Sequence, residues 1–510
     1  MKLISLHQLL NSVDIFPPEI FSNPKITNIS FNSNEVQAGC LFLGLPGTKV
    51  DGGVYWKEAI NNGAVAAIIS KEAEIISGGV DKEKVLVLKK PLDYVFGQII
   101  SEFWNRPSKK LKIIGVTGTN GKTTVTFLLE YLLIKLGKKV ALFGTLYNRW
   151  QEYSEESSFT TDFADKLQAK LNNAIQANNE FAIMEVSSHA IAQKRISGCE
   201  FFCTIFTNLS QDHLDYHHDM ESYFETKMEL FKPPFLVSKN CFSIINADDN
   251  WGRILNKKIE SKALMISTEN EKEYKYENYY YITQKKFTSK GTVCSLNTPN
   301  EKIELFIPLV GEFNLMNSLQ AILTVYELGF PLKDICRIIK TFPGVPGRME
   351  KIQLSKCEKK YLLPEVIVDY AHTPDGLMKI LETIRNFAEG RIITVFGCGG
   401  DRDHTKRSLM GSIAEQFSDY IFITSDNPRS EDPKRIIDDI LCGTKNKNKI
   451  SIEIDRFSAI KKAIDFSISK DIILIAGKGH EDYQILGDKR ISFDDKEISS
   501  KLLIQKLKSL

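Results

Sequence analysis

One ten-residue segment limits the possible folds of this chain more than any other feature. Residues 115–124 read GVTGTNGKTT, and they overlap the end of an apolar run at 112–117 that is typical of a buried strand. An amphipathic pattern from about 123 to 136, closed by Gly137, predicts a helix directly after the loop. A glycine-rich loop between a strand and a helix points backbone N–H groups at an anion, and the helix dipole strengthens the attraction. The segment therefore predicts a phosphate-binding loop.

This loop fits the G-x-x-x-x-G-K-[ST] pattern of nucleotide-binding proteins except at its first glycine, which would fall at Val116. In that pattern Lys122 contacts the β- and γ-phosphates and Thr123 helps to place Mg²⁺. Gly118 and Gly121 permit close approach of the backbone to the ligand. The alternative is a glycine-rich turn without a ligand. The junction between a strand and a helix favours the nucleotide-binding interpretation.

Length and composition favour a soluble enzyme of several domains. At roughly 150 residues per domain, 510 residues correspond to about three domains. The chain has 66 basic and 64 acidic residues, so it lacks the basic excess of a nucleic-acid-binding protein. No apolar run approaches the ~18 residues of a membrane span, and the first residues lack a signal-peptide pattern. The nine cysteines form no CxxC pair, which is typical of reduced thiols. We expect a cytoplasmic monomer without stable membrane insertion.

Alternating strand and helix patterns divide the chain into three α/β regions. The first region is 1–106, the second is 107–343 and the third is 344–510. Two prolines and two glycines at 342–347 predict a hinge before the third region. The alternation predicts mostly parallel sheets with helices on both faces, and a segment at about 278–310 looks antiparallel. Strand patterns occur at 40–45, 64–70, 85–88, 140–143, 181–186, 203–207, 242–246, 366–369, 392–396, 420–424 and 472–476.

Further segments resemble the Mur ligase family of ATP-dependent amide ligases, in the order typical of the family. TGTNGKTT is the ATP-binding motif of these ligases and of the related folylpolyglutamate synthetases. The resemblance covers nearly the whole chain. It implies a small N-terminal α/β domain, a central ATPase domain of the P-loop type and a Rossmann-like C-terminal domain. The matching segments are MEVSSH at 184–189, TNLS at 207–210, DHLDYH at 212–217, GRME at 347–350, DYAHTPD at 369–375 and FGCGGDRD at 396–403.

The resemblance implies that ATP and two Mg²⁺ ions bind between the second and third domains. Lys122, Lys227 and Arg348 are expected to be catalytic. For Asn317, which we expect to begin a helix, adenine contact competes with helix capping, and capping suits Asn314 better. The expected ATP contacts are Gly118, Thr119, Asn120, Gly121, Lys122, Thr123, Thr124, Asn317, Arg348, Asp369 and His372. The expected metal ligands are Thr123, Glu185, His213 and Lys227.

Two of these ligands have ordinary structural alternatives. Glu185 ends an apolar run, where an isolated carboxylate is costly. A Mg²⁺ ion would remove that cost, because it prefers hard oxygen ligands. His213 follows the next strand pattern, and its alternative is a core or surface histidine. His217 and His218 stay ambiguous.

Lys227 lies at helical spacing between four aromatic or aliphatic residues, Tyr223, Phe224, Leu230 and Phe231. The alternative is a lysine that lays its stem along this face with its amino group in water. The resemblance implies a lysine carbamylated by CO₂. That reaction needs the neutral amine, which burial favours. The resulting carbamate is anionic and could bind Mg²⁺ beside His213.

The resemblance also implies two binding regions for a UDP-linked precursor. Without it, most of these residues would be interpreted as surface loops. The uridine diphosphate contacts are expected at Phe31, Ser33, Thr48, Lys49 and Val50. The muramoyl dipeptide contacts are expected at Thr160, Thr161, Ser187, Gln193 and Arg195.

The segment SDNPRSEDP at 425–433 indicates which amino acid is added. Family members that add diaminopimelate have DNPR here, and lysine-adding members usually lack its arginine. Diaminopimelate carries a second carboxylate, which the Arg429 guanidinium can bind with two parallel hydrogen bonds. Glu481 would pair with an ammonium, and the alternative for Arg429 is a polar turn without a ligand. The expected pocket is Arg402, Asp426, Asn427, Pro428, Arg429, Gly477 and Glu481.

The activity implied by the resemblance is ATP-dependent addition of meso-diaminopimelate to UDP-MurNAc-L-Ala-D-Glu, through an acyl phosphate, in peptidoglycan synthesis. One alternative adds L-lysine. Another is a folylpolyglutamate synthetase, which should lack DNPR and the UDP-binding module. A P-loop ATPase without ligase activity would turn over ATP without an acceptor. An inactive binding protein would not need the phosphate, lysine and metal positions together.

Overall fold

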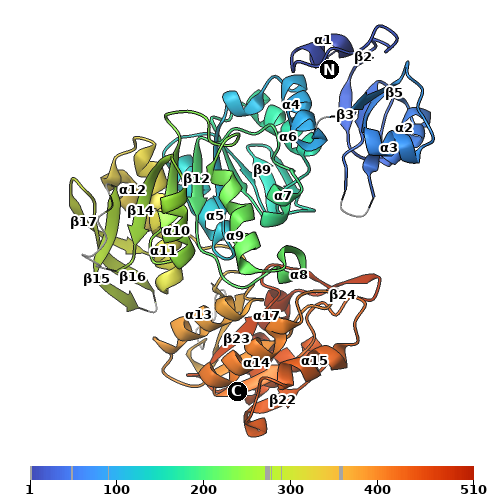
Figure 1. Cartoon of the computed structure of the whole chain (residues 1–510). Coiled ribbons are helices and arrows are strands. Elements are labelled where there is room, and N and C mark those ends of the chain that lie inside the picture. The colour runs from blue at the N-terminus through green and yellow to red at the C-terminus, as the bar shows by residue number, and fades with distance from the viewer. Residues whose placement is uncertain are drawn as a thin grey trace.

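The computed structural model describes residues 3–47, 50–89, 91–269, 276, 278–288, 290–354 and 360–509. Three α/β units follow one another along the chain, each built on its own sheet (Figure 1). The first unit, in blue, and the third, in orange and red, contact different parts of the central unit. The predicted α/β class is confirmed.

A small parallel sheet forms the centre of the first unit, with strand order β3-β4-β5-β6. Its strands are β3 (Asn28–Ser30), β4 (Cys40–Leu43), β5 (Ala64–Ser70) and β6 (Val85–Leu88). A separate antiparallel pair joins β1 (Ile4–Ser5) to β2 (Lys25–Ile26). The strand predicted at 40–45 ends at residue 43, because the chain then turns into the bridge between Pro46 and Asp51. The helices are α1 (Leu6–Asn11), α2 (Trp56–Asn61), α3 (Lys71–Ile76) and α4 (Leu92–Phe103).

The central unit is built on a sheet with strand order β10-β9-β8-β11-β7-β12-β13-β14-β15-β16-β17. The strands from β8 to β15 in this order run parallel, and antiparallel strands extend both edges. Its first strands are β7 (Lys112–Thr117), β8 (Val140–Phe143), β9 (Tyr147–Trp150), β10 (Tyr153–Glu156), β11 (Phe181–Glu185) and β12 (Cys203–Phe206). The remaining strands are β13 (Phe242–Asn246), β14 (Lys262–Ser267), β15 (Tyr279–Thr288), β16 (Gly291–Asn297) and β17 (Lys302–Ile307). The segment predicted to be antiparallel, 278–310, thus extends this sheet.

Apolar side chains of β7 point alternately to the two faces of the central sheet, which explains why helices cover both faces. Ile113 packs into the hydrophobic core on one face, whereas Ile114 and Val116 pack into the core on the other. The helices packed on the Ile114 face include α5 (Lys122–Lys135), α11 (Glu312–Glu327) and α12 (Leu332–Ile339). The helices packed on the Ile113 face include α6 (Ala164–Gln176), α7 (Ser188–Ala192), α9 (Met220–Met228) and α10 (Asn250–Lys258).

The third unit has the strand order β18-β19-β23-β20-β21-β22, and all strands after β18 are parallel. These strands are β18 (Glu350–Lys351), β19 (Glu365–Asp369), β20 (Ile392–Phe396), β21 (Tyr420–Ile423), β22 (Ile450–Ile452) and β23 (Ile472–Ala476). One face packs on α13 (Pro374–Arg385), α14 (Thr405–Phe417) and α15 (Pro433–Leu441), and the other on α16 (Arg456–Phe466) and α17 (Asp495–Ser509). A hairpin of β24 (Tyr483–Leu486) and β25 (Lys489–Ser492) follows β23.

Polar contacts join the third unit to the loops at the carboxyl end of the central sheet. Asp375 accepts hydrogen bonds from Asn120 Nδ2 at 3.0 Å and from Ser210 Oγ at 3.2 Å. Gln211 Nε2 donates to Thr405 Oγ1 at 3.1 Å. The carboxyl-end loops of the second and third sheets therefore face each other, and α8 (Leu214–His217) lies at this junction (Figure 1).

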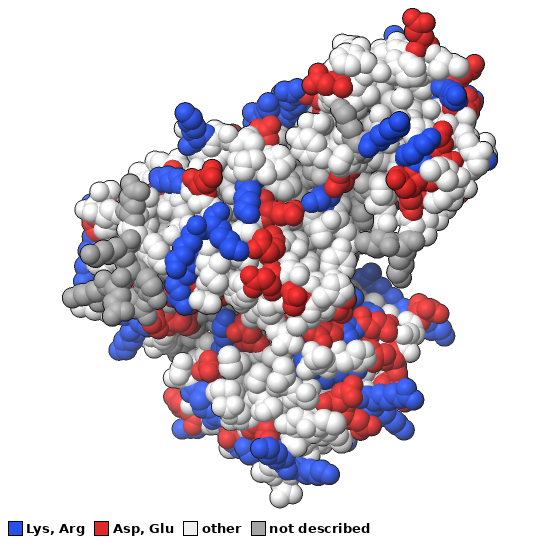
Figure 2. Space-filling model, viewed as in Figure 1, with Lys and Arg blue, Asp and Glu red and all other residues white. Residues whose placement is uncertain are grey.

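The surface carries charges of both signs. On the face shown in Figure 2, basic and acidic side chains are interspersed over all three units. Within the described residues, no helix is both long enough and apolar enough to cross a membrane.

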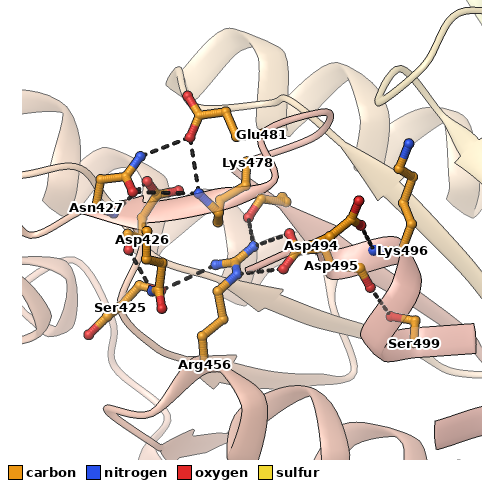
Figure 3. A network of polar contacts seen from close by, with 12 residues as sticks. Ser425, Asp426, Asn427, Arg456, Lys478, Glu481, Asp494, Asp495, Lys496 and Ser499 are labelled. Carbon is orange, nitrogen blue, oxygen red and sulfur yellow. Dashed lines mark hydrogen bonds and ion pairs between the residues drawn. The ribbon is translucent and has the colours of Figure 1, made fainter. Parts of the chain in front are cut away.

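A fully buried ion pair stabilises the third unit behind its loops (Figure 3). The Arg456 guanidinium donates to both carboxylate oxygens of Asp495, at 2.8 and 2.7 Å. It also donates to the carbonyl oxygens of Ser425 at 3.4 Å and Ala476 at 3.1 Å. These two carbonyls lie at or just beyond the ends of β21 and β23, so the pair fixes where the following loops begin.

We predict that Arg456→Met destabilises the protein strongly. The substitution leaves the Asp495 carboxylate buried without a counterion, which costs about 3–5 kcal/mol. Urea unfolding followed by circular dichroism measures the loss. Lys461→Met is the matched control on the same helix, because Lys461 and Asp465 form an exposed pair. Equal unfolding midpoints for the two variants would contradict this role of Arg456.

Candidate active site

The glycine-rich loop between β7 and α5 is shaped by the neighbouring loop after β12. Thr119 N donates to Asn208 O at 2.9 Å, and Asn120 N donates to Asn208 Oδ1 at 3.0 Å. Gly121 has φ +87°, and a Cβ there would overlap the Asn317 side-chain oxygen. Glycine is therefore needed at this position, because the backbone has a positive φ and there is no room for a Cβ. No side chain caps α5, so its first N–H groups can meet an anion.

Two lysines converge on one carbonyl of this loop. Lys122 Nζ donates to the carbonyl oxygens of Gly118 and Thr119, both at 2.8 Å. Lys227 Nζ donates to the same Gly118 oxygen at 3.0 Å. Burial lowers the pKa of Lys122. The loop thus has two lysine amino groups beside the position where a phosphate would lie.

Lys227 points inward from α9, and only 1% of the residue is exposed. The alternative of an amino group held in water is therefore wrong. Its Nζ lies 4.7 Å from the Tyr223 ring centre. Burial, followed by the nearby charge of Lys122, lowers its pKa well below the ordinary lysine value. The structure gives Lys227 the environment in which a neutral, nucleophilic amine is favoured.

Glu185 ends β11 and is buried beside the loop. Its carboxylate accepts hydrogen bonds from Thr123 Oγ1 at 3.0 Å, Thr145 N at 3.0 Å and Thr145 Oγ1 at 2.9 Å. Arg348 from the third unit donates to Thr123 Oγ1 at 3.3 Å. Glu185 and Thr123 thus offer adjacent hard oxygen donors that suit Mg²⁺.

His213 begins α8 with φ +57°, and its side chain is 38% exposed. Its Nε2 lies 3.4 Å from Asp212 Oδ2, and its ring lies 4.7 Å from that of His189. Burial lowers the pKa of His213 to about 3, so the neutral ring is favoured. Among the described residues, no three His, Cys, Asp or Glu side chains are close enough together to hold a metal ion. A second metal site at His213 would therefore need an additional anion, which an unmodified Lys227 cannot supply.

The other ambiguous histidines take different positions. His217 is buried, and its Nε2 lies 2.9 Å from Ser188 Oγ. His218 ends α8 with φ +67°. Neither residue lines the cavity described below.

One sequence prediction about α11 is wrong. The helix begins at Glu312, so Asn317 lies in its second turn and does not begin it. Asn314 does not cap the helix either, because its Nδ2 donates backwards to Val310 O at 2.9 Å. The glycine at 311, with φ +100°, takes the capping position. The side chain of Asn317 instead packs against Gly121.

The third unit brings three more predicted residues to the same place. The Arg348 guanidinium lies 4.5 Å from the Tyr370 ring centre. Asp369 accepts hydrogen bonds from Met349 N and Ala371 N, both at 2.7 Å, so it shapes the backbone around the hinge. Burial raises the pKa of Asp369 and lowers the pKa of His372 to about 4.

Three residues of the DNPR segment, Asp426, Asn427 and Arg429, line a polar part of the cavity described below. Figure 3 shows Asp426 and Asn427 beside Lys478 and Glu481. Asn427 Nδ2 donates to Glu481 Oε2 at 2.8 Å, and the buried Lys478 Nζ donates to the same oxygen at 3.0 Å. Arg429 has φ +52°, and its guanidinium donates to Gly400 O at 2.7 Å. A Cβ at position 477 would lie 2.5 Å from Asp426 Oδ2, which explains the glycine there. Burial raises the pKa of Glu481.

The residues predicted for the UDP-linked precursor lie in two places. Ser33 Oγ donates to Glu58 Oε2 at 2.9 Å within the first unit. Phe31 packs against Phe96, and Val50 is exposed. Thr48 and Lys49 lie outside the described residues.

The dipeptide residues lie in the central unit, around Arg195. Its guanidinium lies 4.7 and 4.2 Å from the ring centres of Phe159 and Phe163, and NH1 donates to Thr161 O at 3.0 Å. Gln193 Oε1 accepts hydrogen bonds from the same guanidinium. The remaining contacts are Thr145 Oγ1 to Thr160 Oγ1 at 3.2 Å and Ala190 N to Ser187 Oγ at 3.1 Å.

A cavity of about 1460 Å³ between the second and third units joins most of these groups. The predicted residues that line it are Thr119, Asn120, Gly121, Lys122, Thr123, Thr124, Thr160, Glu185, Ser187, Arg195, His213, Asn317, Arg348, Asp369, His372, Arg402, Asp426, Asn427, Arg429, Gly477 and Glu481. The described predicted residues that do not line it are Phe31, Ser33, Val50, Gly118, Thr161, Gln193, Lys227 and Pro428.

Sequence reasoning missed two buried lysines here. Lys478 supports Glu481, and Lys406 lines the cavity. Lys478 lies between the predicted pocket residues Gly477 and Glu481, and Lys406 follows the FGCGGDRD segment at 396–403. Their burial, however, depends on contacts between distant segments. Sequence spacing alone gave no signal of it.

Comparison with known proteins agrees with this geometry. Three family models match: the catalytic domain of the Mur ligase family at 25–116, the Mur ligase middle domain at 116–325 and the glutamate ligase domain of Mur ligases at 347–479. A Prochlorococcus marinus subsp. pastoris protein named UDP-N-acetylmuramoyl-L-alanyl-D-glutamate–2,6-diaminopimelate ligase is 61% identical over 510 residues, with 100% of both chains covered. A Trichormus variabilis protein of the same name is 44% identical over 508 residues, with the same coverage.

Solved structures show the same relationship. A solved structure of a UDP-N-acetylmuramoyl-L-alanyl-D-glutamate–2,6-diaminopimelate ligase is 30% identical in sequence, with a TM-score of 0.69. The match covers 99% of this chain and 100% of that chain. MurF from Acinetobacter baumannii, at 16% identity and a TM-score of 0.63, shares the fold over 100% of both chains. The fold and the site define an amide-ligase architecture with a phosphate loop facing a second polar pocket. The chain belongs to the Mur ligase family.

We predict that Gly121→Ala strongly weakens nucleotide binding, because the added methyl group overlaps the Asn317 amide and displaces the loop. ATP affinity, measured by calorimetry, should fall by about two orders of magnitude or more, in line with a loss of roughly 3 kcal/mol. Gly137→Ala is the matched control at the other end of α5. Its φ is also positive, +79°, but a Cβ there meets nothing within 4 Å. Equal ATP affinities in the two variants would contradict the steric argument.

Proposed function

We propose that this chain is an ATP-dependent ligase that adds meso-diaminopimelate to UDP-MurNAc-L-Ala-D-Glu through an acyl phosphate, in peptidoglycan synthesis. Residues 1–106 bind the UDP moiety, residues 107–343 bind ATP, and residues 344–510 bind the amino acid. The proposal places the chain in the cytoplasm as a monomer, as the family resemblance implies.

One observation carries this proposal. A single cavity is lined by the phosphate-loop lysine, Lys122, and by an amino-acid pocket that contains Arg429 and Glu481. An ATPase without an acceptor has no use for the second pocket. The relatives at 61% and 44% identity are named as diaminopimelate ligases, which supports this amino acid over lysine and over a folate substrate.

In the first step a carboxylate oxygen of D-Glu attacks the γ-phosphorus of ATP, and the bond to the ADP oxygen breaks. Negative charge spreads over the three equatorial oxygens of the phosphoryl group. Lys122 belongs to the central unit and Arg348 to the third unit. Both line the cavity, and Arg348 reaches Thr123, the residue after Lys122, so the phosphoryl group would meet side chains from both units. Fixed positive groups of this kind stabilise the transition state.

In the second step the amine of the amino acid attacks the acyl carbon. The amide bond forms, the bond from carbon to the phosphate oxygen breaks, and the proton lost by the amine passes to the departing phosphate or to water. Glu481 and Asn427 hold the amino acid at one end, and Arg429 binds its distal carboxylate. The junction of the two units shields the acyl phosphate from water.

Mg²⁺ fits the first part of the site. Thr123 and Glu185 would hold one ion, and when bound it would neutralise phosphate charge. A carbamate on Lys227, formed from CO₂, would supply the missing anion beside His213. The buried position and lowered pKa of Lys227 favour this modification.

The direct experiment incubates the protein with ATP, UDP-MurNAc-L-Ala-D-Glu and either meso-diaminopimelate or L-lysine. Mass spectrometry should find one added diaminopimelate residue for each ADP released. ADP release without an amide product would favour the plain ATPase, and a lysine adduct formed in preference would favour the lysine-adding alternative.

We predict that Lys227→Ala is nearly inactive and that acetate partly restores its activity. The small carboxylate would occupy the space of the lysine side chain and supply an anion there. Steady-state ADP release at rising acetate concentration measures the rescue. Lys258→Ala is the control, because Lys258 is an exposed lysine paired with Glu225. A fully active Lys227→Ala protein would show that the lysine is structural.

We predict that Arg429→Ala raises the KM for meso-diaminopimelate by about ten- to a hundredfold, because a charge-assisted bidentate contact contributes roughly 1.5–3 kcal/mol. The KM for ATP should stay within about threefold. Within the described residues the Arg429 guanidinium donates only one hydrogen bond, so most of its N–H groups remain for the ligand. Kinetics with both amino acids measure the effect. An unchanged diaminopimelate KM would remove Arg429 from specificity but leave the ligase activity in place.

A further inference from the structure

Lys406 lies in the first turn of α14, in the third unit, where the helix N-terminus faces the cavity. Only 5% of the residue is exposed, and its side chain lines the cavity wall. The Asp403 carboxylate accepts a hydrogen bond from Thr405 N, the first N–H of this helix, at 2.8 Å. The helix dipole adds a positive potential at the position of Lys406.

Lys406 makes no hydrogen bond or ion pair with any residue that the structure describes. Its neighbour Arg407 shows the contrast, because Arg407 pairs with Glu431 at 2.8 Å and Asp439 at 2.8 Å. The Lys406 side chain is thus almost enclosed by protein but lines the cavity without a described partner. A ligand that carries negative charge could pair with its amino group there.

The groups around Lys406 come from several elements. His372 follows β19 and Asp212 follows β12, and both lie within electrostatic reach. Asp212 lies beside His213 at 3.4 Å. Asp403 accepts two hydrogen bonds from Thr405 through Oδ1, and its Oδ2 is buried without a partner. The carboxylates of Asp212 and Asp403 repel an anion. A bound anion would therefore lie on the side of the Lys406 amino group.

A contact between the two units places the start of α14 beside the loop after β12. Thr405, the preceding residue, accepts a hydrogen bond from Gln211 in the loop that also carries Asp212 and His213. Lys122 of the central unit lines the same cavity, and Asp212 lies within electrostatic reach of both Lys406 and Lys122. A phosphoryl group bound at the phosphate loop would therefore lie near positive side chains from both units.

We propose that Lys406 is a further catalytic residue, whose amino group contacts the oxygens of the phosphoryl group as it passes from ATP to the substrate carboxylate. The inference rests on the proposed ligase function. No proton is transferred: Lys406 stabilises the charge of the phosphoryl oxygens while the bond to ADP breaks and the bond to the carboxylate forms. The alternative is a counterion that only stabilises the buried Asp212.

The test compares the full-length wild type with Lys406→Met, Lys406→Arg and Lys406→Ala. Removal of one preorganised charge-stabilising donor lowers kcat by about 10²–10³-fold. We expect that loss in Lys406→Met, with the KM for meso-diaminopimelate and the thermal unfolding temperature nearly unchanged. Lys406→Arg should retain at least about a tenth of kcat, and ethylamine should partly rescue Lys406→Ala, because both restore a cation. Lys434→Met is the matched control, an exposed lysine in the first turn of α15.

The outcomes separate this inference from the ligase function. A wild type that forms no amide product contradicts the ligase function itself. A wild type that ligates, with Lys406→Met within threefold of its kcat, overturns the role of Lys406 alone. A Lys406→Met protein that loses its cooperative unfolding transition, with no ethylamine rescue of Lys406→Ala, also overturns it and identifies Lys406 as the counterion of Asp212.

Discussion

The carbonyl oxygen of Gly118 accepts hydrogen bonds from both Lys122 and Lys227, at 2.8 and 3.0 Å. Burial lowers the pKa of both amines, and the charge of Lys122 lowers the pKa of Lys227 further. The arrangement therefore favours a neutral amine on Lys227 beside the loop that faces the cavity. The proposed carbamate depends on it.

The contacts between the second and third units bring the phosphate loop together with the amino-acid pocket. Arg348 reaches Thr123 at 3.3 Å, and Asp375 binds the side chain of Asn120 at 3.0 Å. These contacts bring the amino-acid pocket and the phosphate loop to one cavity of about 1460 Å³. The buried pair of Arg456 and Asp495 holds the strand ends from which that pocket is built. Binding and chemistry therefore depend on the same contacts that order the two units.

Local patterns predict the elements, and distant contacts decide the details. The strand and loop at 112–121 could be predicted because apolar alternation, glycine and the following helix agree with one another. Asn317 was misplaced, because the five helical residues before it carry no strong start signal and the capping position is a glycine. Lys406 was missed, because sequence spacing gives no signal that it is buried beside the cavity between the two units. The roles of the predicted ligand contacts stay predictions.

The central claim is that this cavity activates a carboxylate by phosphorylation. It is tested most directly with UDP-MurNAc-L-Ala-D-Glu labelled with ¹⁸O in the side-chain carboxylate of D-Glu. If an acyl phosphate forms, one labelled oxygen leaves with the phosphate, so the inorganic phosphate released during ligation should carry a single ¹⁸O. Unlabelled phosphate released together with the amide product would contradict the account.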